Sequence, residues 1–237
     1  MICPECNRPV YFLESYLAGS KARCLQCRHR GDPVEISYET YHDDLYSKPV
    51  RRDRKTDPQM KWILSQLAIQ PGDVVVDLGC GVGDYTREIH SMTSHAAGYD
   101  RDVRAAIRKC PGVSFFAHNL NQPLPLPNAS VDKIVSINVI EHLFDWHFFL
   151  QECVRVLRHG GLVAFSTANK SFLLHEIHFD PTHYHEWTLD EFKNLAGKSL
   201  KILQARKDCA MFNYYPLNQL LRFFLKPDLT LIARKPY

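Results

Sequence analysis

The sequence lacks a hydrophobic run long enough to cross a membrane, and it lacks a large excess of either charge. No stretch of 18 residues is continuously apolar, so we expect no spanning helix. The first residues, Met-Ile-Cys-Pro-Glu-Cys, contain no basic stretch followed by an apolar one, so we expect no secretory signal and a cytoplasmic protein. Lysine and arginine number 29 against 26 acidic residues, and the net charge of +3 does not by itself require a nucleic-acid partner.

The eight cysteines need an explanation other than disulfides, because the cytosol is reducing. Four of them form two Cys-x-x-Cys pairs near the N-terminus: Cys3, Cys6, Cys24 and Cys27. This spacing is typical of a structural zinc site with four thiolate ligands. The pattern resembles a zinc ribbon, which we place at residues 1–37. The alternative is four free thiols in a disordered leader.

Residues 38–58 are polar and charged and are interpreted as a linker. Its basic run, Arg51–Lys55, could contact phosphate, but a solvated connector is the simpler interpretation. Residues 59–237 alternate between strand and helix patterns, which predicts a doubly wound, mainly parallel α/β sheet. The predicted strands are 73–78, 95–99, 113–118, 132–138, 161–167, 199–205 and 229–234. The clearest predicted helices are 84–91, 101–109, 146–158 and 188–196, with Gly160-Gly161 ending the third.

The most informative stretch is a glycine turn that follows a buried strand. Val74–Val76 leads into Asp77-Leu78-Gly79-Cys80-Gly81-Val82-Gly83, and a helix pattern follows. Glycines allow a tight turn and a close approach of a ligand to the backbone. The next strand ends at Asp100, and an acid about 20 residues after such a turn is suited to binding ribose hydroxyls.

These residues resemble the class I S-adenosylmethionine-dependent methyltransferases. The resemblance continues through Asn119-Leu120, Leu124–Pro127, Ser130–Asp132 and Ile140–Leu143, and it covers residues 60–237. It implies S-adenosylmethionine as cofactor and a seven-stranded Rossmann-like sheet whose last strand is antiparallel. It also implies a methyltransferase activity.

The resemblance implies a set of cofactor-binding residues. They are Asp77, Gly79, Cys80, Gly81, Asp100, Arg101, Asn119, Leu120 and Asn138. Asp77 and the backbone at Gly79 and Gly81 would hold the methionine part, Asp100 the ribose diol, and Arg101 would lie beside the adenine. Asn119 falls where the family often has an acid for the adenine amino group, and its amide oxygen is a weaker acceptor. Asn138, at the tip of the fourth strand, would line the methyl-donor end.

Histidines are concentrated where this fold carries substrate-facing loops. Methyl transfer to oxygen needs a base, and histidine is the usual one near neutral pH. The candidate catalytic residues are His183, His142, His178 and His185. The alternative is that these histidines pack loops or lie on the surface.

A second resemblance concerns a metal. In the small-RNA 3′-terminal 2′-O-methyltransferases, a Glu-x-x-Glu-His sequence and a later histidine bind a divalent cation. The matching positions here are Asn138, Glu141, His142 and His183, with an amide in place of the first acid. An amide is a poorer ligand for a hard cation, so we do not expect this metal. The alternative for Glu141 and His142 is a role in structuring the cofactor pocket.

The prediction is an O-methyltransferase acting on a small molecule or glycan. The alternative is an RNA methyltransferase, of the rRNA type or metal-assisted at 2′-O, that holds RNA with the zinc ribbon and basic linker. A non-catalytic adaptor is a third, weaker hypothesis. The aromatic segment 211–225 could pack in the core, mediate a homodimer or contact a lipid-linked acceptor.

Overall fold

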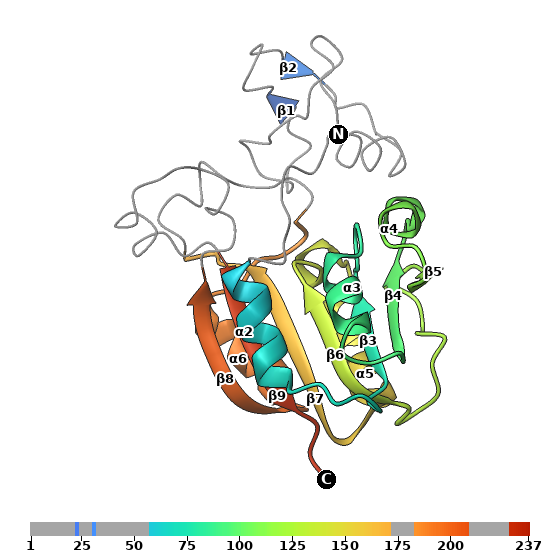
Figure 1. Cartoon of the computed structure of the whole chain (residues 1–237). Coiled ribbons are helices and arrows are strands. Elements are labelled where there is room, and N and C mark those ends of the chain that lie inside the picture. Colours follow the sequence, from blue (N-terminus) through green and yellow to red (C-terminus); the bar gives the residue numbers. More distant parts are fainter. Residues whose placement is uncertain (1–21, 24–29, 32–56, 172–182, 209–227) are drawn as a thin grey trace. The chain divides into compact units, whose positions relative to one another are not determined.

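Figure 1 shows the fold of the chain, which is a computed structural model. The structure describes residues 22–23, 30–31, 57–171, 183–208 and 228–237. Several predictions fall outside these residues: the four zinc-ligand cysteines Cys3, Cys6, Cys24 and Cys27, the basic run Arg51–Lys55, His178 and the aromatic segment 211–225. They remain predictions.

The N-terminal part contains two short strands. β1 (Ala22–Arg23) pairs antiparallel with β2 (Arg30–Gly31). In the sequence, the two strands flank the second Cys-x-x-Cys pair. The structural zinc site stays a prediction.

The larger part forms a seven-stranded sheet in the order β5-β4-β3-β6-β7-β9-β8. Its strands are β3 (Val75–Leu78), β4 (Ala96–Asp100), β5 (Ser114–Ala117), β6 (Val131–Ile137), β7 (Leu157–Ala168), β8 (Lys201–Asp208) and β9 (Asp228–Arg234). The first five strands in this order, from β5 through β4, β3 and β6 to β7, pair in parallel with their neighbours. β9 runs antiparallel to both β7 and β8. This confirms the predicted doubly wound sheet with an antiparallel last strand. The carboxyl ends of the parallel strands share one edge, which is where ligands bind in such sheets.

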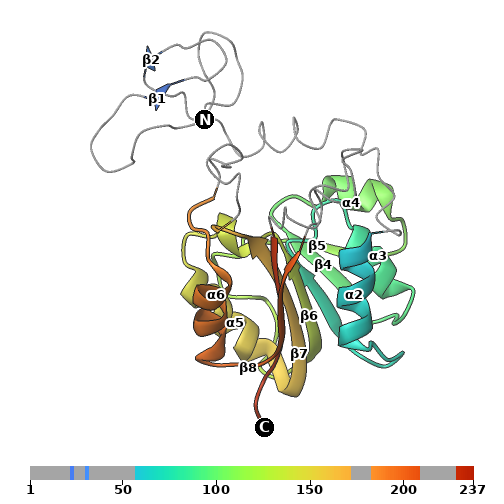
Figure 2. The same cartoon turned by 90° about the vertical axis from the view of Figure 1, so that its left-hand side faces the viewer.

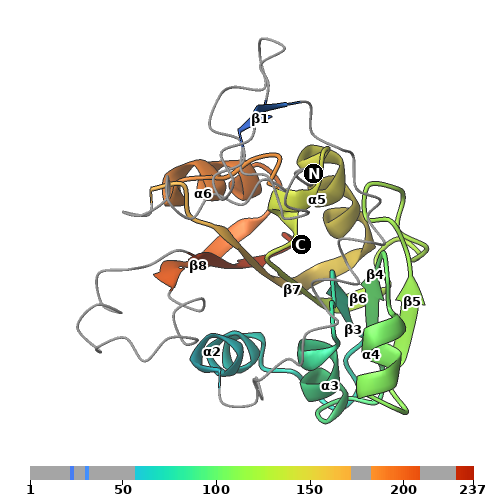
Figure 3. The same cartoon turned by 90° about the horizontal axis from the view of Figure 1, so that it is seen from above.

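Helices cover both faces of this sheet (Figures 2 and 3). One face carries α2 (Pro58–Leu67), α3 (Asp84–His90) and α4 (Arg104–Lys109), and the other carries α5 (Trp146–Val156) and α6 (Leu189–Gly197). Successive residues of β3 are all buried, because alternate side chains enter different cores. Val75 packs with α2 and α3 residues, whereas Val76 and Leu78 pack in the core of the α5 face.

Local sequence explains where two of these helices begin. Asp57 caps α2 by accepting from the N–H of Gln59, with Pro58 at the first helical position. Thr188 and Glu191 form a capping box at the start of α6. Within the described residues, we find no helix long and apolar enough to cross a membrane.

The predicted end of the third helix was wrong. α5 ends at Val156, and Gly160 and Gly161 lie inside β7 instead of terminating the helix. The Lys235 ammonium donates to the carbonyl oxygens of Val154 and Leu157 (2.7 and 2.8 Å) and satisfies the helix end there. The apolar period of the helix continues through Leu157, so periodicity could not show that the chain had become a strand.

Candidate active site

The glycine turn lies between β3 and α3 and requires glycine for its conformation. Gly79, Gly81 and Gly83 have φ angles of 84°, 52° and 84°, in the left-handed region that other residues rarely adopt. A Cβ atom on Gly79 would lie 2.1 Å from Cγ2 of Val139. The backbone therefore packs directly against the chain that follows β6, and a side chain cannot enter there.

Asp100, at the end of β4, faces this turn. Its Oδ2 accepts from the N–H of Gly81 (2.8 Å), and its Oδ1 lies 3.4 Å from the nitrogen of Asp102. The residue is 8% exposed, and within the described part of the chain no cation pairs with it. A buried carboxylate that is held only by backbone N–H groups keeps lone pairs for other donors. The geometry fits a group that accepts from the two hydroxyls of a ribose.

Asp77, the first residue of the motif, has a structural contact. Its Oδ2 accepts from the hydroxyl of Thr86 (2.7 Å), and both residues are buried. This bond joins the end of β3 to the first turns of α3. The predicted contact of Asp77 with the methionine part of the cofactor stays a prediction.

Three further predicted residues differ in exposure. Cys80 is buried, and burial together with Asp77 and Asp100 raises the pKa of its thiol well above the usual range, so it is not a nucleophile. Leu120 packs in the core of the α5 face, whereas Arg101 is exposed.

Asn119 lies beyond the end of β5 and is partly buried. Its Oδ1 accepts from both the backbone nitrogen and the side-chain amide of Asn121 (3.1 and 3.2 Å). The oxygen that we expected to accept from an adenine amino group is therefore shared with a local turn in this structure. A direct role in adenine binding stays a prediction.

Asn138 follows β6 and has a φ angle of 55°, which is uncommon for a residue other than glycine. Its backbone N–H donates to the carbonyl of Ser166 (2.9 Å), and its Oδ1 accepts from the Ser166 hydroxyl (3.2 Å). The side chain is exposed. The strained conformation is thus held by two contacts with β7.

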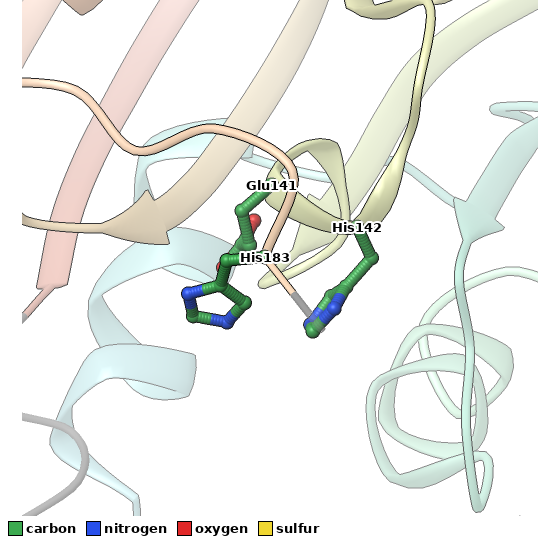
Figure 4. Close-up of side chains that lie close together, drawn as sticks. All are labelled: Glu141, His142 and His183. Atoms are coloured by element: carbon green, nitrogen blue, oxygen red, sulfur yellow. The ribbon is translucent and has the colours of Figure 1, made fainter. Parts of the chain in front are cut away.

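Glu141, His142 and His183 lie close together, and Figure 4 shows their side chains. One possible ligand atom from each lies within 4.8 Å of the others. Glu141 and His142 belong to the short 3-10 helix η2 (Ile140–His142), and the N–H of Tyr184, next to His183, donates to the Glu141 carbonyl (2.7 Å). The donor set fits a divalent cation such as Zn²⁺ in chemistry.

The Glu141 carboxylate already has protein partners. Its Oε2 accepts from the Thr167 hydroxyl (2.9 Å), its Oε1 accepts from the Ala168 N–H (3.2 Å), and Glu141 is 1% exposed. These bonds fasten η2 to the end of β7. They agree with the interpretation that Glu141 structures the pocket, although a carboxylate retains further lone pairs.

Comparisons with known proteins agree with this geometry. Residues 76–165 match the family described as "Methyltransferase domain". Among solved structures, an S-adenosylmethionine-dependent methyltransferase from Mesorhizobium loti superposes with a TM-score of 0.60 at 18% identity, over 78% of this chain and 99% of that one. Residues 76–165 therefore match a methyltransferase domain, and the sheet has the fold of that S-adenosylmethionine-dependent methyltransferase structure.

A curated relative and a further solved structure are also similar to this chain. A probable S-adenosylmethionine-dependent methyltransferase of Mycobacterium tuberculosis is 38% identical over 127 residues, which are 51% of this chain and 46% of that protein. The chain therefore spans about half the length of this curated relative. A methyltransferase solved in a complex with the Trm112 methyltransferase activator of Haloferax volcanii has a TM-score of 0.66 at 18% identity, over 86% of this chain and all of that chain.

His185 lies in an aromatic environment. Its ring stacks on Trp146 (centroids 4.8 Å apart) and lies 4.7 Å from the Trp187 ring. Burial, with a smaller contribution from Lys170, lowers the pKa of His185 below its usual value, so the ring is neutral near pH 7. The structure therefore places His185 in an aromatic cluster, outside the group formed by Glu141, His142 and His183.

Sequence reasoning missed the polar residues that support this edge of the sheet. Ser166 and Thr167 are fully buried at the end of β7, and Gln59 is buried at the start of α2. The one available indication was the change from apolar residues to Ser-Thr at the end of a predicted strand. Gln59 gave none, because a glutamine near a helix start is usually exposed.

Proposed function

We propose that the chain transfers a methyl group from S-adenosylmethionine to an oxygen of a small molecule or glycan. The observation that carries the proposal is the Asp100 carboxylate, buried at the glycine turn and held there by the Gly81 N–H. We further propose a cytoplasmic enzyme with a structural zinc in residues 1–37. A homodimer is left as an open prediction.

In this proposal, the chain's residues bind the cofactor and remove a proton. S-adenosylmethionine would supply an activated methyl group. Asp100 would accept from the ribose hydroxyls, and the glycine turn would leave room for the methionine part beside its backbone. A proton of the acceptor hydroxyl would pass to an imidazole nitrogen of His142 or His183, because a neutral imidazole is an effective base near pH 7.

Relatives supply the reason for preferring oxygen. A ubiquinone biosynthesis O-methyltransferase of Rhizobium leguminosarum is 26% identical over 149 residues, which are 60% of this chain and 54% of that protein. Named activities of relatives at this identity are a guide to the atom that is methylated, and they do not identify the acceptor. The group of polar side chains after β6 and β7 is consistent with a polar acceptor.

A metal-assisted methylation is the second candidate. The observation that favours it is the group of Glu141, His142 and His183, whose donor atoms lie within 4.8 Å of one another. Asn138 stands where the small-RNA 2′-O-methyltransferases have their first acid. Its amide oxygen accepts a hydrogen bond from the Ser166 hydroxyl. Among the described residues, the metal would then have three protein ligands, and an RNA acceptor would fit this candidate best.

The test is methyl transfer by the full chain from S-adenosylmethionine with a labelled methyl group into fractionated cell extract. We expect label in polar small molecules or glycans, and no label with Asp100→Ala. RNase-sensitive label that also disappears with a chelator would support the second candidate instead. Failure of the purified chain to bind S-adenosylmethionine in calorimetry would contradict both.

Variants of the histidines separate a base from a packing residue. His142→Ala and His183→Ala should each lower the transfer rate by about 10²-fold or more if that residue is the base. His185→Phe, which keeps an aromatic ring between Trp146 and Trp187, is the matched control and should retain most activity. Equal losses in all three variants would contradict the assignment.

A further inference from the structure

We propose that Gln59 positions Asn138 through Ser166, so that Asn138 presents amide N–H donors to an oxygen atom bound at the methyl-transfer end of the site. The orientation of the amide is argued from protein contacts alone. Only the identity of the bound oxygen rests on the proposed function.

The contacts form one continuous chain of hydrogen bonds across three strands. Nε2 of Gln59, a residue of α2, lies 3.1 Å from the Ser166 hydroxyl on β7 and 3.1 Å from the Thr230 hydroxyl on β9. Ser166 is 3.2 Å from Oδ1 of Asn138, and Thr230 is 2.7 Å from Oδ2 of Asp208 on β8. Gln59 is 5% exposed, and Ser166 and Thr230 are fully buried.

The ion pair at one end determines the direction of every bond. Arg206 donates to both oxygens of Asp208 (2.7 Å each), which keeps that carboxylate charged and able only to accept. The Thr230 hydroxyl therefore donates its single proton to Asp208, and it can only accept from Gln59. The Gln59 atom that faces Thr230 must then be the amide nitrogen.

The same reasoning continues to Asn138. Because Nε2 of Gln59 has two protons, it donates the second to Ser166. Among the described residues, the other hydrogen-bond partner of the Ser166 hydroxyl is the Asn138 side chain, so the hydroxyl donates its own proton there. Its partner on Asn138 is therefore the amide oxygen. Amide orientations are otherwise ambiguous, and a charged group at the end of a chain resolves the ambiguity.

The consequence for the site is a defined polarity. With Oδ1 of Asn138 held by Ser166, the two N–H groups of this exposed side chain are the part directed away from β7. They suit an oxygen that accepts hydrogen bonds. Two sources share this chemistry: the carboxylate of the cofactor's methionine part, and the acceptor oxygen as it loses its proton.

The decisive variant is Gln59→Glu, which reverses the polarity. A carboxylate accepts from the Ser166 hydroxyl, so Ser166 has no proton left for Asn138, and the amide turns to donate to Ser166. In the single variant, the new carboxylate also faces the Thr230 hydroxyl, which donates its one proton to Asp208. The carboxylate and the hydroxyl oxygen then have no proton between them. The double variant Gln59→Glu with Asp208→Asn relieves this conflict and keeps the test possible if the single variant does not fold.

The first measurement is nuclear magnetic resonance of the Asn138 side-chain amide, identified by its loss in Asn138→Ala. In the wild type, both N–H protons should exchange rapidly with water. In the polarity-reversed variant, one should become protected. Gln66→Ala, on the same helix but bonded to Gln204 on the surface, is the matched control and should leave the signals unchanged.

The second measurement separates the two sources of oxygen. A cofactor contact predicts an S-adenosylmethionine Kd about tenfold higher in the reversed variant, whereas an acceptor contact predicts an unchanged Kd and a kcat about tenfold lower on the labelled extract fraction. Protected Asn138 protons in the wild type, or no change of amide, Kd and kcat in a folded reversed variant, would overturn the proposal. If the wild type fails to bind S-adenosylmethionine, the proposed function is contradicted, and the amide measurement still decides the orientation.

Discussion

The two halves of the ligand-binding edge of the sheet are built in different ways. Around β3 and β4, the Gly81 backbone bonds to Asp100, a residue 19 positions away. Around β6 and β7, side chains far apart in sequence meet: Gln59 contacts Ser166 and Thr230 across separations of 107 and 171 residues. The first half depends on backbone conformation, and the second depends on how side chains share protons.

This difference matters for function, because the two halves would have different tasks. The β3–β4 half requires little beyond glycine and one acid, which suits a cofactor that every enzyme of the class uses. The β6–β7 half combines an exposed amide, a buried glutamate and two histidines, and small changes there alter which groups donate and which accept. We therefore expect acceptor choice to depend on the second half.

The largest expected effect tests the first half. Asp100→Ala removes the proposed acceptor of the ribose hydroxyls and should raise the S-adenosylmethionine Kd by about 10²-fold or more, since each hydrogen bond to a charged group contributes about 1.5–3 kcal/mol. Calorimetry measures it. Asp102→Ala, a neighbouring acid whose carboxylate pairs with Arg104 instead, is the control and should bind nearly normally. Equal losses in the two variants would show that the effect is structural.

The second prediction asks whether the first half depends on backbone conformation. Gly79→Ala forces a side chain into the left-handed region and against Val139, and it should lower the free energy of unfolding by about 2–4 kcal/mol. Urea denaturation measures the change. Gly72→Ala is the control, because nothing lies within 4 Å of its added Cβ. A well-tolerated Gly79→Ala would mean that the turn adapts more easily than its geometry indicates.

The third prediction removes a partner from the second half. Glu141→Ala leaves the Thr167 hydroxyl and the Ala168 N–H without their acceptor and should reduce the free energy of unfolding by about 1–3 kcal/mol. Glu141→Gln retains an acceptor and should lose less. If both variants are as stable as the wild type but inactive, Glu141 acts on the ligand and not on the fold.

The smallest expected effect concerns Glu152 on α5, outside both halves, and serves as a reference for the other variants. Glu152 accepts from Arg155 and from the Leu124 N–H, and the hydrogen bond from Arg155 is the main reason that the pKa of Glu152 is lowered. A lowered pKa means that the stabilisation is present above the unfolded pKa near 4.5 and is lost as the pH falls through the folded value. Glu152→Gln should therefore cost about 1 kcal/mol at pH 7 and less at pH 3.

Thermal denaturation of the wild type and Glu152→Gln between pH 7 and pH 3 checks this sign. The two stability curves should converge as the pH decreases. A difference that stays constant, or grows towards pH 3, would contradict a carboxylate that is stabilised in its charged form.

Much of the fold could be predicted from the sequence, since strands and helices alternate with clear apolar patterns. The predicted strands overlap the seven strands of the sheet, and the helix predicted over 188–196 corresponds to α6. The end of α5 could not be predicted, because Lys235, from the far end of the chain, caps it. Periodicity contains no information about such a distant partner.

The site divides in the same way. The proximity of the glycine turn to Asp100 could be predicted, because a strand, a glycine turn and an acid at the next strand end have a defined spacing. Their role in cofactor binding stays a prediction. The aromatic setting of His185 was missed, since Trp146 and Trp187 belong to different elements. Gln59 and Ser166 were missed because ordinary polar residues become informative only when their partners are known.

By itself, the sequence determined the sheet, its helical layers and the position of the glycine turn beside Asp100, because these follow from local preferences and short spacings along the chain. Only the tertiary structure decided which polar groups of the other half meet, and therefore which of them donate and which accept. A hydroxyl or an amide has no fixed polarity until its neighbours are in place, and here the neighbour that sets it is a carboxylate on a different strand.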